Sequence, residues 1–379
     1  MALGGIMKIH LIVGARPNFM KMAPLYREFK KFSDLFEVRL IHTGQHYDQK
    51  MSKVFFDDLN MPQPDFYLGV GSGSHGAQTA KIMEEYEKVL LEDKPDWVIV
   101  AGDVNSTVAC ALDAVKLHIK VAHLEAGLRS FDRSMPEEIN RLATDAISDL
   151  LLTPSLDGNQ HLKNEGVADN KIVFVGNIMI DSLVQQKNKA DLSKILTQLN
   201  QQHNIKLEKG NYCLITLHRP SNVDTKEGLK VILDAFEKIA KELHLIFPIH
   251  PRTQKNIEKF GFEEQIKRMS NLIFTEPIGY YDFMHLQMNA KFILTDSGGI
   301  QEESTYFGVP CLTLRENTER PITITEGTNQ LVELKTETII EKADEIIKGN
   351  SKKGKIPDLW DGKTAERVVE LFKRIRGEV

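Results

Sequence analysis

Three acidic residues in the first half of the chain, Asp103, Glu125 and Glu137, stand where the ends of buried strands and the start of a helix are expected. Because the carboxyl ends of parallel strands meet at one edge of a sheet, we expect the three carboxylates to converge on one cleft. Clustered carboxylates shift one another's pKa values and are typical of acid–base catalysis. Structural explanations also exist: Asp103 could cap a helix that begins near Asn105, and Glu137 and Glu138 could stabilise a helix dipole from its first turn.

A glycine-rich turn in the second half could hold a phosphate group. The apolar run at residues 291–295 predicts a buried strand, and residues 300–307 predict a helix, with Ser297, Gly298 and Gly299 between them. The first N–H groups of a helix have no internal partner, and the helix dipole adds positive potential there. The turn is therefore suited to an anion, although glycine-rich strand-to-helix turns are also common in α/β proteins without any ligand.

Three cations could hold the same anion. Arg16 and Lys21 lie near the start of a helix that Pro17 opens after the first strand, where a solvated helix entry is the structural alternative. Arg320 follows the strand after the glycine turn, and the guanidinium fork suits a diphosphate. The first strand is not followed by GxGxxG, so the dinucleotide-binding fingerprint is missing and no nicotinamide cofactor is expected.

Histidine and aromatic side chains are also expected near the strand ends of the second half. His218 and Arg219 follow one strand and His250 follows the next, and two strand-end histidines near arginine favour a functional surface over a purely structural one. Phe283 belongs to the segment that precedes the glycine turn, and its ring could stack on a flat base.

Composition narrows the class of protein. A chain of 379 residues exceeds one ordinary core, so two domains are expected. A net charge of −5 argues against a nucleic-acid-binding surface. No apolar run is long enough for a membrane helix, and residues 1–6 lack the features of a signal peptide and could precede a natural start at Met7. We therefore expect a cytoplasmic protein.

Neither the cysteines nor the histidines predict a metal site. The three cysteines lie inside apolar runs without CxxC spacing, so we expect buried thiols in a reducing compartment: Cys110, Cys213 and Cys311. His42 and His46 bracket a strand end, but no carboxylate spacing completes a set of ligands.

Short apolar, β-rich runs alternate with helical patterns along the whole chain, which predicts an α/β protein with parallel sheets. Strands are expected at residues 9–13, 38–42, 97–101, 121–124, 150–153 and 172–175, and again at 212–217, 245–249, 272–275, 292–295 and 310–314. A polar helical segment at about residues 181–202 separates the two series. We therefore expect two doubly wound, Rossmann-type domains that face a cleft, residues 7–180 and 181–362, and a final helix within residues 363–379 that packs back on the first domain.

Seven sequence motifs together resemble one enzyme family, the non-hydrolysing UDP-N-acetylglucosamine 2-epimerases. The resemblance runs from about Lys8 to the C-terminus, in order and without a large gap. Its motifs are Gly14-Ala15-Arg16-Pro17 with Lys21-Met22-Ala23-Pro24, His42-Thr43-Gly44-Gln45-His46, Ala101-Gly102-Asp103, His123-Leu124-Glu125-Ala126-Gly127-Leu128-Arg129, Pro136-Glu137-Glu138, Leu217-His218-Arg219 and Asp296-Ser297-Gly298-Gly299-Ile300-Gln301-Glu302-Glu303.

The resemblance implies a GT-B-like fold, a homodimer and reversible epimerisation at C2 of UDP-N-acetylglucosamine (UDP-GlcNAc) to UDP-N-acetylmannosamine (UDP-ManNAc), with no cofactor or metal. The residues carried over as catalytic are Asp103, Glu125, Glu137 and His218. Those carried over as substrate- or UDP-binding are Arg16, Lys21, Phe283, Ser297, Gly298, Gly299, Glu303 and Arg320, with Glu303 on the ribose hydroxyls. Some bacterial members bind a second UDP-GlcNAc as an activator, and the matching positions here are Gln45, Glu138, Arg219 and His250.

The chemistry fits these residue types. The C2 proton has no adjacent carbonyl, so direct deprotonation is implausible, whereas departure of UDP from C1 would acidify it strongly. The family's route is elimination of UDP to 2-acetamidoglucal, followed by re-addition with a proton on the other face. The same motifs leave three alternatives open: an epimerase of a modified UDP-sugar such as a diacetamido uronic acid, a hydrolysing epimerase, and a GT-B glycosyltransferase.

Overall fold

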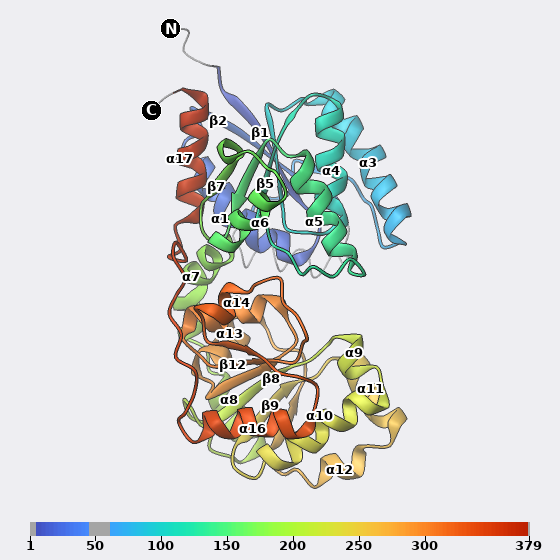
Figure 1. Ribbon diagram of the computed structural model, residues 1–379, viewed down its shortest axis with the longest axis vertical. Coiled ribbons are helices and arrows are strands. Elements are labelled where there is room, and N and C mark those ends of the chain that lie inside the picture. Colours follow the sequence, from blue (N-terminus) through green and yellow to red (C-terminus); the bar gives the residue numbers. More distant parts are fainter. Residues whose placement is uncertain (1–4, 45–60, 378–379) are drawn as a thin grey trace. The chain divides into compact units, whose positions relative to one another are not determined.

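The computed structural model of the protein describes residues 5–44 and 61–377, and the chain divides into two compact units (Figure 1). We call Met1–Leu183 together with Asp358–Val379 the N-terminal unit, and Val184–Pro357 the C-terminal unit. The returning segment joins the N-terminal unit at Asp358, earlier than the expected boundary after residue 362. The reason is Trp360, whose buried ring donates its Nε1–H to the carbonyl of Pro154 at 3.0 Å.

The N-terminal unit is built on a doubly wound parallel sheet. Its described strands are β1 (Met7–Val13), β2 (Phe36–His42), β3 (Phe66–Tyr67), β4 (Trp97–Ala101), β5 (Lys120–Leu124), β6 (Leu150–Thr153) and β7 (Ile172–Phe174). They lie in the order β3-β2-β1-β4-β5-β6-β7, and each neighbouring pair runs parallel. The order reverses between β1 and β4, and ligands bind beyond the strand ends at such a switch point.

Helices cover both faces of this sheet. They are α1 (Arg16–Lys30), α3 (His75–Glu92), α4 (Asn105–Lys116), α5 (Pro136–Ile147), α6 (Leu156–Asn164), the 3-10 helix η1 (Asp169–Lys171), the first turns of α7 (Ile178–Asp191), and α17 (Thr364–Arg376). Val98 packs in one apolar cluster with α3 and α4, whereas its neighbour Trp97 contacts α17. Adjacent residues of a strand point to opposite faces, so α3 and α4 cover one face and α17 the other.

The C-terminal helix is fixed by aromatic packing and by a buried cap. The ring of Phe372 lies 5.6 Å from that of Phe29 in α1 and 5.3 Å from that of Trp97, both edge-on. Asp181 in α7 accepts hydrogen bonds from the backbone N–H groups of Thr364 at 3.1 Å and Ala365 at 2.7 Å, the first residues of α17. Burial raises the pKa of Asp181 to about 6, although these backbone donors oppose the shift.

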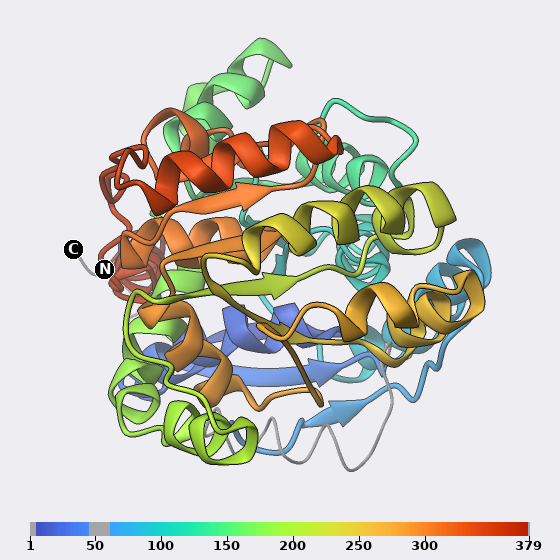
Figure 2. The same cartoon turned by 90° about the horizontal axis from the view of Figure 1, so that it is seen from below.

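The C-terminal unit repeats the architecture. Its strands are β8 (Tyr212–Thr216), β9 (His244–Pro248), β10 (Leu272–Thr275), β11 (Phe292–Thr295), β12 (Cys311–Thr313) and β13 (Asn329–Leu331). They lie in the order β10-β9-β8-β11-β12-β13, again with parallel pairs, and the order reverses between β8 and β11. Figure 2 shows helices on both sides of these strands.

The helices of this unit form two layers. They are the end of α7, α8 (Ile195–His203), α9 (Pro220–Val223), α10 (Lys226–Ile239), α11 (Pro251–Phe260), α12 (Glu263–Lys267), α13 (Tyr280–Asn289), α14 (Gly298–Phe307), α15 (Ile322–Thr325) and α16 (Thr336–Ile347). Cys213 packs in a cluster with α10 and α16, and Leu214 in a second cluster with α8, α13 and α14. The alternation along β8 therefore gives the sheet two buried faces, as doubly wound sheets require.

The structure confirms the prediction of two doubly wound parallel sheets and corrects several details. The segment expected as one helix at 181–202 is two helices, α7 and α8. The glycines expected in a turn before residue 300 are the first two residues of α14, with Ser297 as N-cap. The strands β3 and β13, with two and three residues, were not expected.

The structure also describes the three cysteines and the length and polarity of the helices. The three cysteines are free and buried, and burial raises the pKa of each thiol. Among the residues that the structure describes, no helix combines the length and the apolar character needed to cross a membrane.

The docking of α17 gives a first testable prediction. Phe372→Ala removes a fully buried ring, so we expect it to destabilise the N-terminal unit by about 3–5 kcal/mol. Both tryptophans of the chain, Trp97 and Trp360, lie in this unit, so intrinsic tryptophan fluorescence during urea unfolding reports on it selectively. The matched control is Ile375→Ala on the same helix, because Ile375 is exposed and should change the midpoint little. Equal midpoints for Phe372→Ala and the wild type would contradict this packing.

Candidate active site

In the N-terminal unit, a carboxylate and an ammonium group lie together beyond the carboxyl end of strand β5. Lys21 Nζ in α1 lies 2.7 Å from Glu125 Oε2, just beyond β5, and both side chains are buried. A Cβ atom at Gly102 would lie 2.7 Å from Lys21 Nζ, so a side chain at this position would displace the lysine. Lys21 and Glu125, which were predicted separately as a cation and an acid of the site, therefore form an ion pair with each other.

The backbone holds Glu125 in an unfavourable conformation. Its φ is +72°, in the left-handed region that few residues other than glycine adopt. Hydrogen bonds from the N–H groups of Glu125 and Ala126 to the carbonyl of Leu152, at 3.0 and 3.1 Å, hold the turn. Such strain persists where the surrounding structure fixes it and is common at functional sites.

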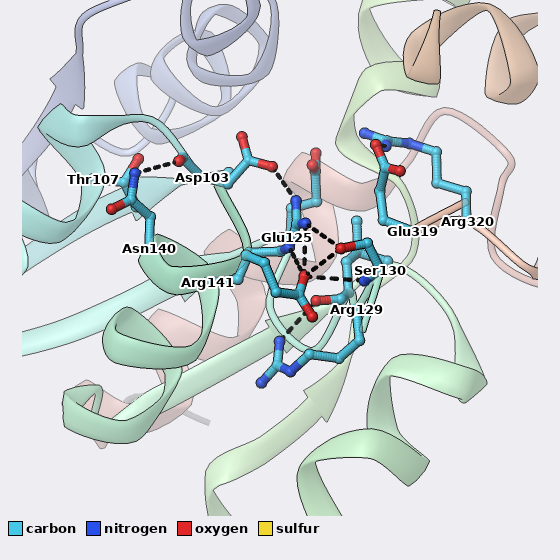
Figure 3. A network of polar contacts seen from close by, with 12 residues as sticks. Asp103, Thr107, Glu125, Arg129, Ser130, Asn140, Arg141, Glu319 and Arg320 are labelled. Atoms are coloured by element: carbon cyan, nitrogen blue, oxygen red, sulfur yellow. Dashed lines mark hydrogen bonds and ion pairs between the residues drawn. The ribbon is translucent and has the colours of Figure 1, made fainter. Parts of the chain in front are cut away.

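Asp103 reaches a different cation. Arg141 in α5 pairs with Asp103 through Nη1 and with Glu138 through Nη2 at 2.7 Å, as Figure 3 shows for the pair with Asp103. Asn140 Nδ2 donates to the carbonyl of Asp103 at 2.8 Å. Asp103 is therefore tied to α5, and the N-cap of α4 is the next residue, Val104.

Glu138 holds the turn that follows β5. Its carboxylate accepts hydrogen bonds from Ser130 N and Oγ at 3.0 Å and from Phe131 N at 2.9 Å, besides those from Arg141. Burial opposes ionisation, but these donors and Arg141 together keep the pKa of Glu138 below its ordinary value. In this structure Glu138, predicted as a possible activator-binding residue, is a buried support of the Ser130–Phe131 turn.

Glu137 differs from the other acids. It is partly exposed in the first turn of α5, and it makes no hydrogen bond or ion pair with any residue that the structure describes. Asp103 and Glu125, by contrast, each face a buried cation. The three predicted catalytic carboxylates therefore have three different electrostatic environments.

A buried network of hydrogen bonds and ion pairs around His123 and Asp145 was not predicted from the sequence. His123 in β5 contacts Asp145 Oδ1 through Nδ1 at 2.6 Å and the carbonyl of Gly102 through Nε2 at 2.8 Å. Asp145 also accepts from Arg129 Nη2 at 2.7 Å and from Gly127 N at 3.1 Å. Burial opposes its ionisation, but His123 and Arg129 lower the pKa of Asp145. The network fixes both loops that carry Asp103 and Glu125.

In the C-terminal unit, the start of α14 combines free N–H groups with a guanidinium group. A Cβ atom at Gly298 would lie 2.9 Å from Arg320 Nη1 and 3.0 Å from Glu319 Oε1. Arg320 is therefore placed directly against the first turn of the helix, where Figure 3 shows it beside Glu319. Helix starts and arginine side chains both commonly bind phosphate groups in proteins.

Glu319 places two arginines at this site. Its Oε1 lies 2.7 Å from Arg320 Nη1, and its Oε2 lies 2.8 Å from Arg315 Nη2. Burial opposes ionisation, but the two guanidinium groups hold the pKa of Glu319 far below its ordinary range. Arg320 Nε also lies 3.0 Å from Glu302 Oε1 in α14. Arg320 was predicted from the sequence as a site residue, whereas Glu319 and Arg315, which lie beside it, were not.

His218 is held by a carboxylate that the sequence analysis did not select. Asp296, at the end of β11, is fully buried, and its Oδ1 lies 2.9 Å from Nδ1 of His218. The same carboxylate accepts hydrogen bonds from Arg219 N at 2.9 Å and Asn222 Nδ2 at 3.0 Å. Burial opposes ionisation, but His218 and these donors lower the pKa of Asp296.

The remaining predicted residues lie as follows. Glu303 in α14 is buried, and Phe283 in α13 is half-buried against the apolar cluster below α8. His250 is exposed and caps α11, its Nδ1 accepting from Arg252 N at 3.2 Å. Arg16 opens α1 but its side chain is not among the described ones, and Gln45 lies outside the described residues.

Comparisons with known proteins agree on one family. The family model described as UDP-N-acetylglucosamine 2-epimerase matches residues 28–373. A UDP-N-acetylglucosamine 2-epimerase of Methanocaldococcus jannaschii is 45% identical, over 97% of this chain and 99% of its own. A UDP-2,3-diacetamido-2,3-dideoxy-D-glucuronate 2-epimerase of Pseudomonas aeruginosa is 40% identical, over 89% of this chain and 91% of its own. The crystal structure of the M. jannaschii enzyme in complex with UDP-GlcNAc and UDP has a TM-score of 0.84, at 44% identity, over 97% of this chain and 100% of that chain.

The depressed pKa of Glu319 predicts how stability depends on pH. Its ionised form contributes stability above the ordinary carboxyl pKa of 4.5, and this contribution is lost progressively as the pH falls below that value. We expect Glu319→Gln to destabilise the C-terminal unit by roughly 3–5 kcal/mol at pH 7 and by less near pH 3. Hydrogen exchange of the α14 amides measures this locally.

The control for this prediction is Glu333→Gln, which removes a carboxylate from an exposed pair with Lys335. Exposed pairs contribute little, so exchange in α14 should not change. A Glu319→Gln effect of the same size at pH 3 and pH 7 would show that the charge of Glu319 is not the cause.

Proposed function

Because the chain belongs to the UDP-N-acetylglucosamine 2-epimerase family, we propose that it interconverts UDP-GlcNAc and UDP-ManNAc by reversible elimination and re-addition of UDP. The observation that carries the proposal is the division of charge between the two units. One unit carries the three carboxylates, and the other has a helix start beside an arginine at α14. The proposal assigns the sugar to the carboxylates and the diphosphate to the start of α14.

The anion site would act on the leaving group. As the C1–O bond breaks, its electron pair goes to the oxygen that remains on the β-phosphate, and negative charge develops there. The N–H groups of Gly298 and Gly299 and the guanidinium of Arg320 are suited to stabilise that charge. Because Glu319 and Glu302 already hold Arg320, little reorganisation is needed at the moment of reaction.

The carboxylates would act on the sugar. Departure of UDP leaves cationic character at C1, which nearby carboxylates stabilise and which acidifies the C2 proton. Loss of that proton to a carboxylate gives 2-acetamidoglucal, and a proton delivered to the opposite face of C2 during re-addition gives the epimer. Two groups on two faces are needed, which accounts for more than one acid in the site.

The partners of the acids suggest their roles. Glu125 lies against Lys21 and Asp103 lies against Arg141, so both carboxylates are held in place and are suited to stabilise the cation. Glu137 is partly exposed and has no cation among the described residues, so it is suited to meet the substrate directly. We therefore assign one of the two proton transfers to Glu137, and the other to Asp103 or Glu125.

A modified substrate is the second candidate. The P. aeruginosa relative is named for a diacetamido uronate sugar, and it is 40% identical to this chain. The reaction at C1 and C2 would be the same, and only the contacts to C3 and C6 of the sugar would differ. Comparing turnover of the two UDP-sugars by the same preparation separates these candidates.

Proton NMR of UDP-GlcNAc incubated with the purified protein in D2O tests the proposal. We expect UDP-ManNAc with deuterium at C2, because the transferred proton exchanges with solvent on the carboxylates. Free ManNAc with UDP would indicate the hydrolysing reaction instead. Absence of product from both UDP-sugars would contradict an epimerase function.

The role of Glu137 is tested in the same assay. Glu137→Gln should lower kcat by roughly 100-fold to 10,000-fold, the range for loss of a general acid–base group. The control is Glu84→Gln, because Glu84 is an exposed residue of α3. Wild-type turnover by Glu137→Gln would remove Glu137 from the mechanism.

A further inference from the structure

Asp296 connects two parts of the C-terminal unit that have separate roles in the proposed reaction. Its backbone immediately precedes Ser297, the N-cap of α14. Its side chain lies 2.9 Å from Nδ1 of His218, in the loop after β8. The strands β8 and β11 are neighbours, with Thr216 paired to Thr295 and their hydroxyl oxygens 2.6 Å apart. The histidine and the anion site therefore share one strand-end surface.

The contact with Asp296 determines what His218 can offer to a ligand. A carboxylate accepts hydrogen bonds, so Nδ1 of the ring carries a proton. The other ring nitrogen, Nε2, is then the atom left to meet a ligand, and the side chain is 58% exposed. A ring that carries a proton on Nε2 as well donates hydrogen bonds from both nitrogens.

We propose that Asp296 is a positioning residue that fixes the ring of His218 and directs its Nε2–H toward the diphosphate bound at the start of α14. This inference rests on the proposed function and adds a donor to the leaving-group site. When the C1–O bond breaks, the electron pair moves to the β-phosphate oxygen, and His218 stabilises the new charge by hydrogen bonding. In the reverse direction the same donor orients that oxygen for attack on C1.

A purely structural role is the competing explanation, because Asp296 also accepts from backbone groups of the same loop. The two explanations differ in how the substitutions combine. If Asp296 acts through the ring, its charge has no catalytic effect once the ring is gone. If it only supports the loop, its loss should weaken catalysis whether or not the ring is present.

The test is a double-mutant cycle with Asp296→Asn and His218→Gln. We expect each single variant to lower kcat by roughly 10-fold to 100-fold, the range for partners that orient a histidine. The double variant should be no slower than the slower single variant. Multiplication of the two losses in the double variant would overturn the proposal.

A control variant measures the effect of loosening the loop alone. Asn256 in α11 donates to the carbonyl of Val223 at 3.0 Å and to Asp224 Oδ1 at 3.0 Å, at the end of the same segment. It contacts neither Asp296 nor His218, so Asn256→Ala should lower stability without lowering kcat. A loss in kcat as large as that of Asp296→Asn would identify loop stability as the cause and overturn the proposal.

A spectroscopic readout separates this proposal from the proposed function. In protein labelled with 15N-histidine, the His218 signals are identified by their absence in His218→Gln. We expect an Nδ1–H signal that Asp296→Asn removes, and a shift of Nε2 when UDP is added. If the wild type fails to epimerise any UDP-sugar, the proposed function fails, and the response to UDP still tests the contact. An Nε2 signal unchanged by saturating UDP would overturn the proposal whatever the activity.

Discussion

A buried ion pair between Lys21 and Glu125 sets the arrangement of the N-terminal unit's acidic rim. The two atoms are 2.7 Å apart, and neither side chain is open to water. Breaking such a pair by removing one partner typically costs about 3–5 kcal/mol, because the other charge stays buried. The pair also requires Gly102, which leaves room for the ammonium group, and a left-handed backbone at Glu125. The contact thus depends on the backbone at two neighbouring strand ends.

The C-terminal unit uses the same principle with the charges reversed. There the buried carboxylates do the positioning, and the groups they hold are donors. Glu319 bridges Arg315 and Arg320, and Asp296 holds the ring of His218. In both units, carboxylates and nitrogen donors hold one another in place, and such preorganisation would reduce the reorganisation that the proposed reaction requires.

The three acids of the N-terminal unit differ in their partners. Lys21 pairs with Glu125, Arg141 pairs with Asp103, and Glu137 has no cation among the described residues. The proposed reaction handles protons on two faces of one carbon, and acids with different partners are suited to different parts of it.

Much of this arrangement could be predicted from sequence, because it depends on local pattern. The strands at 97–101, 150–153, 272–275 and 292–295 end where apolar runs end. Asp103 follows the first of these strands, and Glu125 follows the neighbouring strand β5. The partners of those acids could not be predicted. Arg141 and Asp145 lie on the inner side of α5, and only the tertiary packing of that helix brings them to Asp103 and His123.

One difference from the prediction concerns Gly298 and Gly299. They were expected in a turn before the helix, whereas they form the first two residues of α14. The first N–H groups of a helix have no intrahelical partner, so the two glycines can present these groups to a ligand from within the helix as well.

The proposed reaction requires the C1–O bond to break and re-form during epimerisation. Positional isotope exchange tests it directly, with 18O placed in the oxygen that bridges C1 and the β-phosphate of UDP-GlcNAc. Once UDP is released inside the site, rotation of its β-phosphate makes the terminal oxygens equivalent. We expect 31P NMR to show the label moving from the bridging to the non-bridging positions as UDP-ManNAc accumulates. Epimerisation with the label retained entirely in the bridge would contradict elimination and re-addition of UDP.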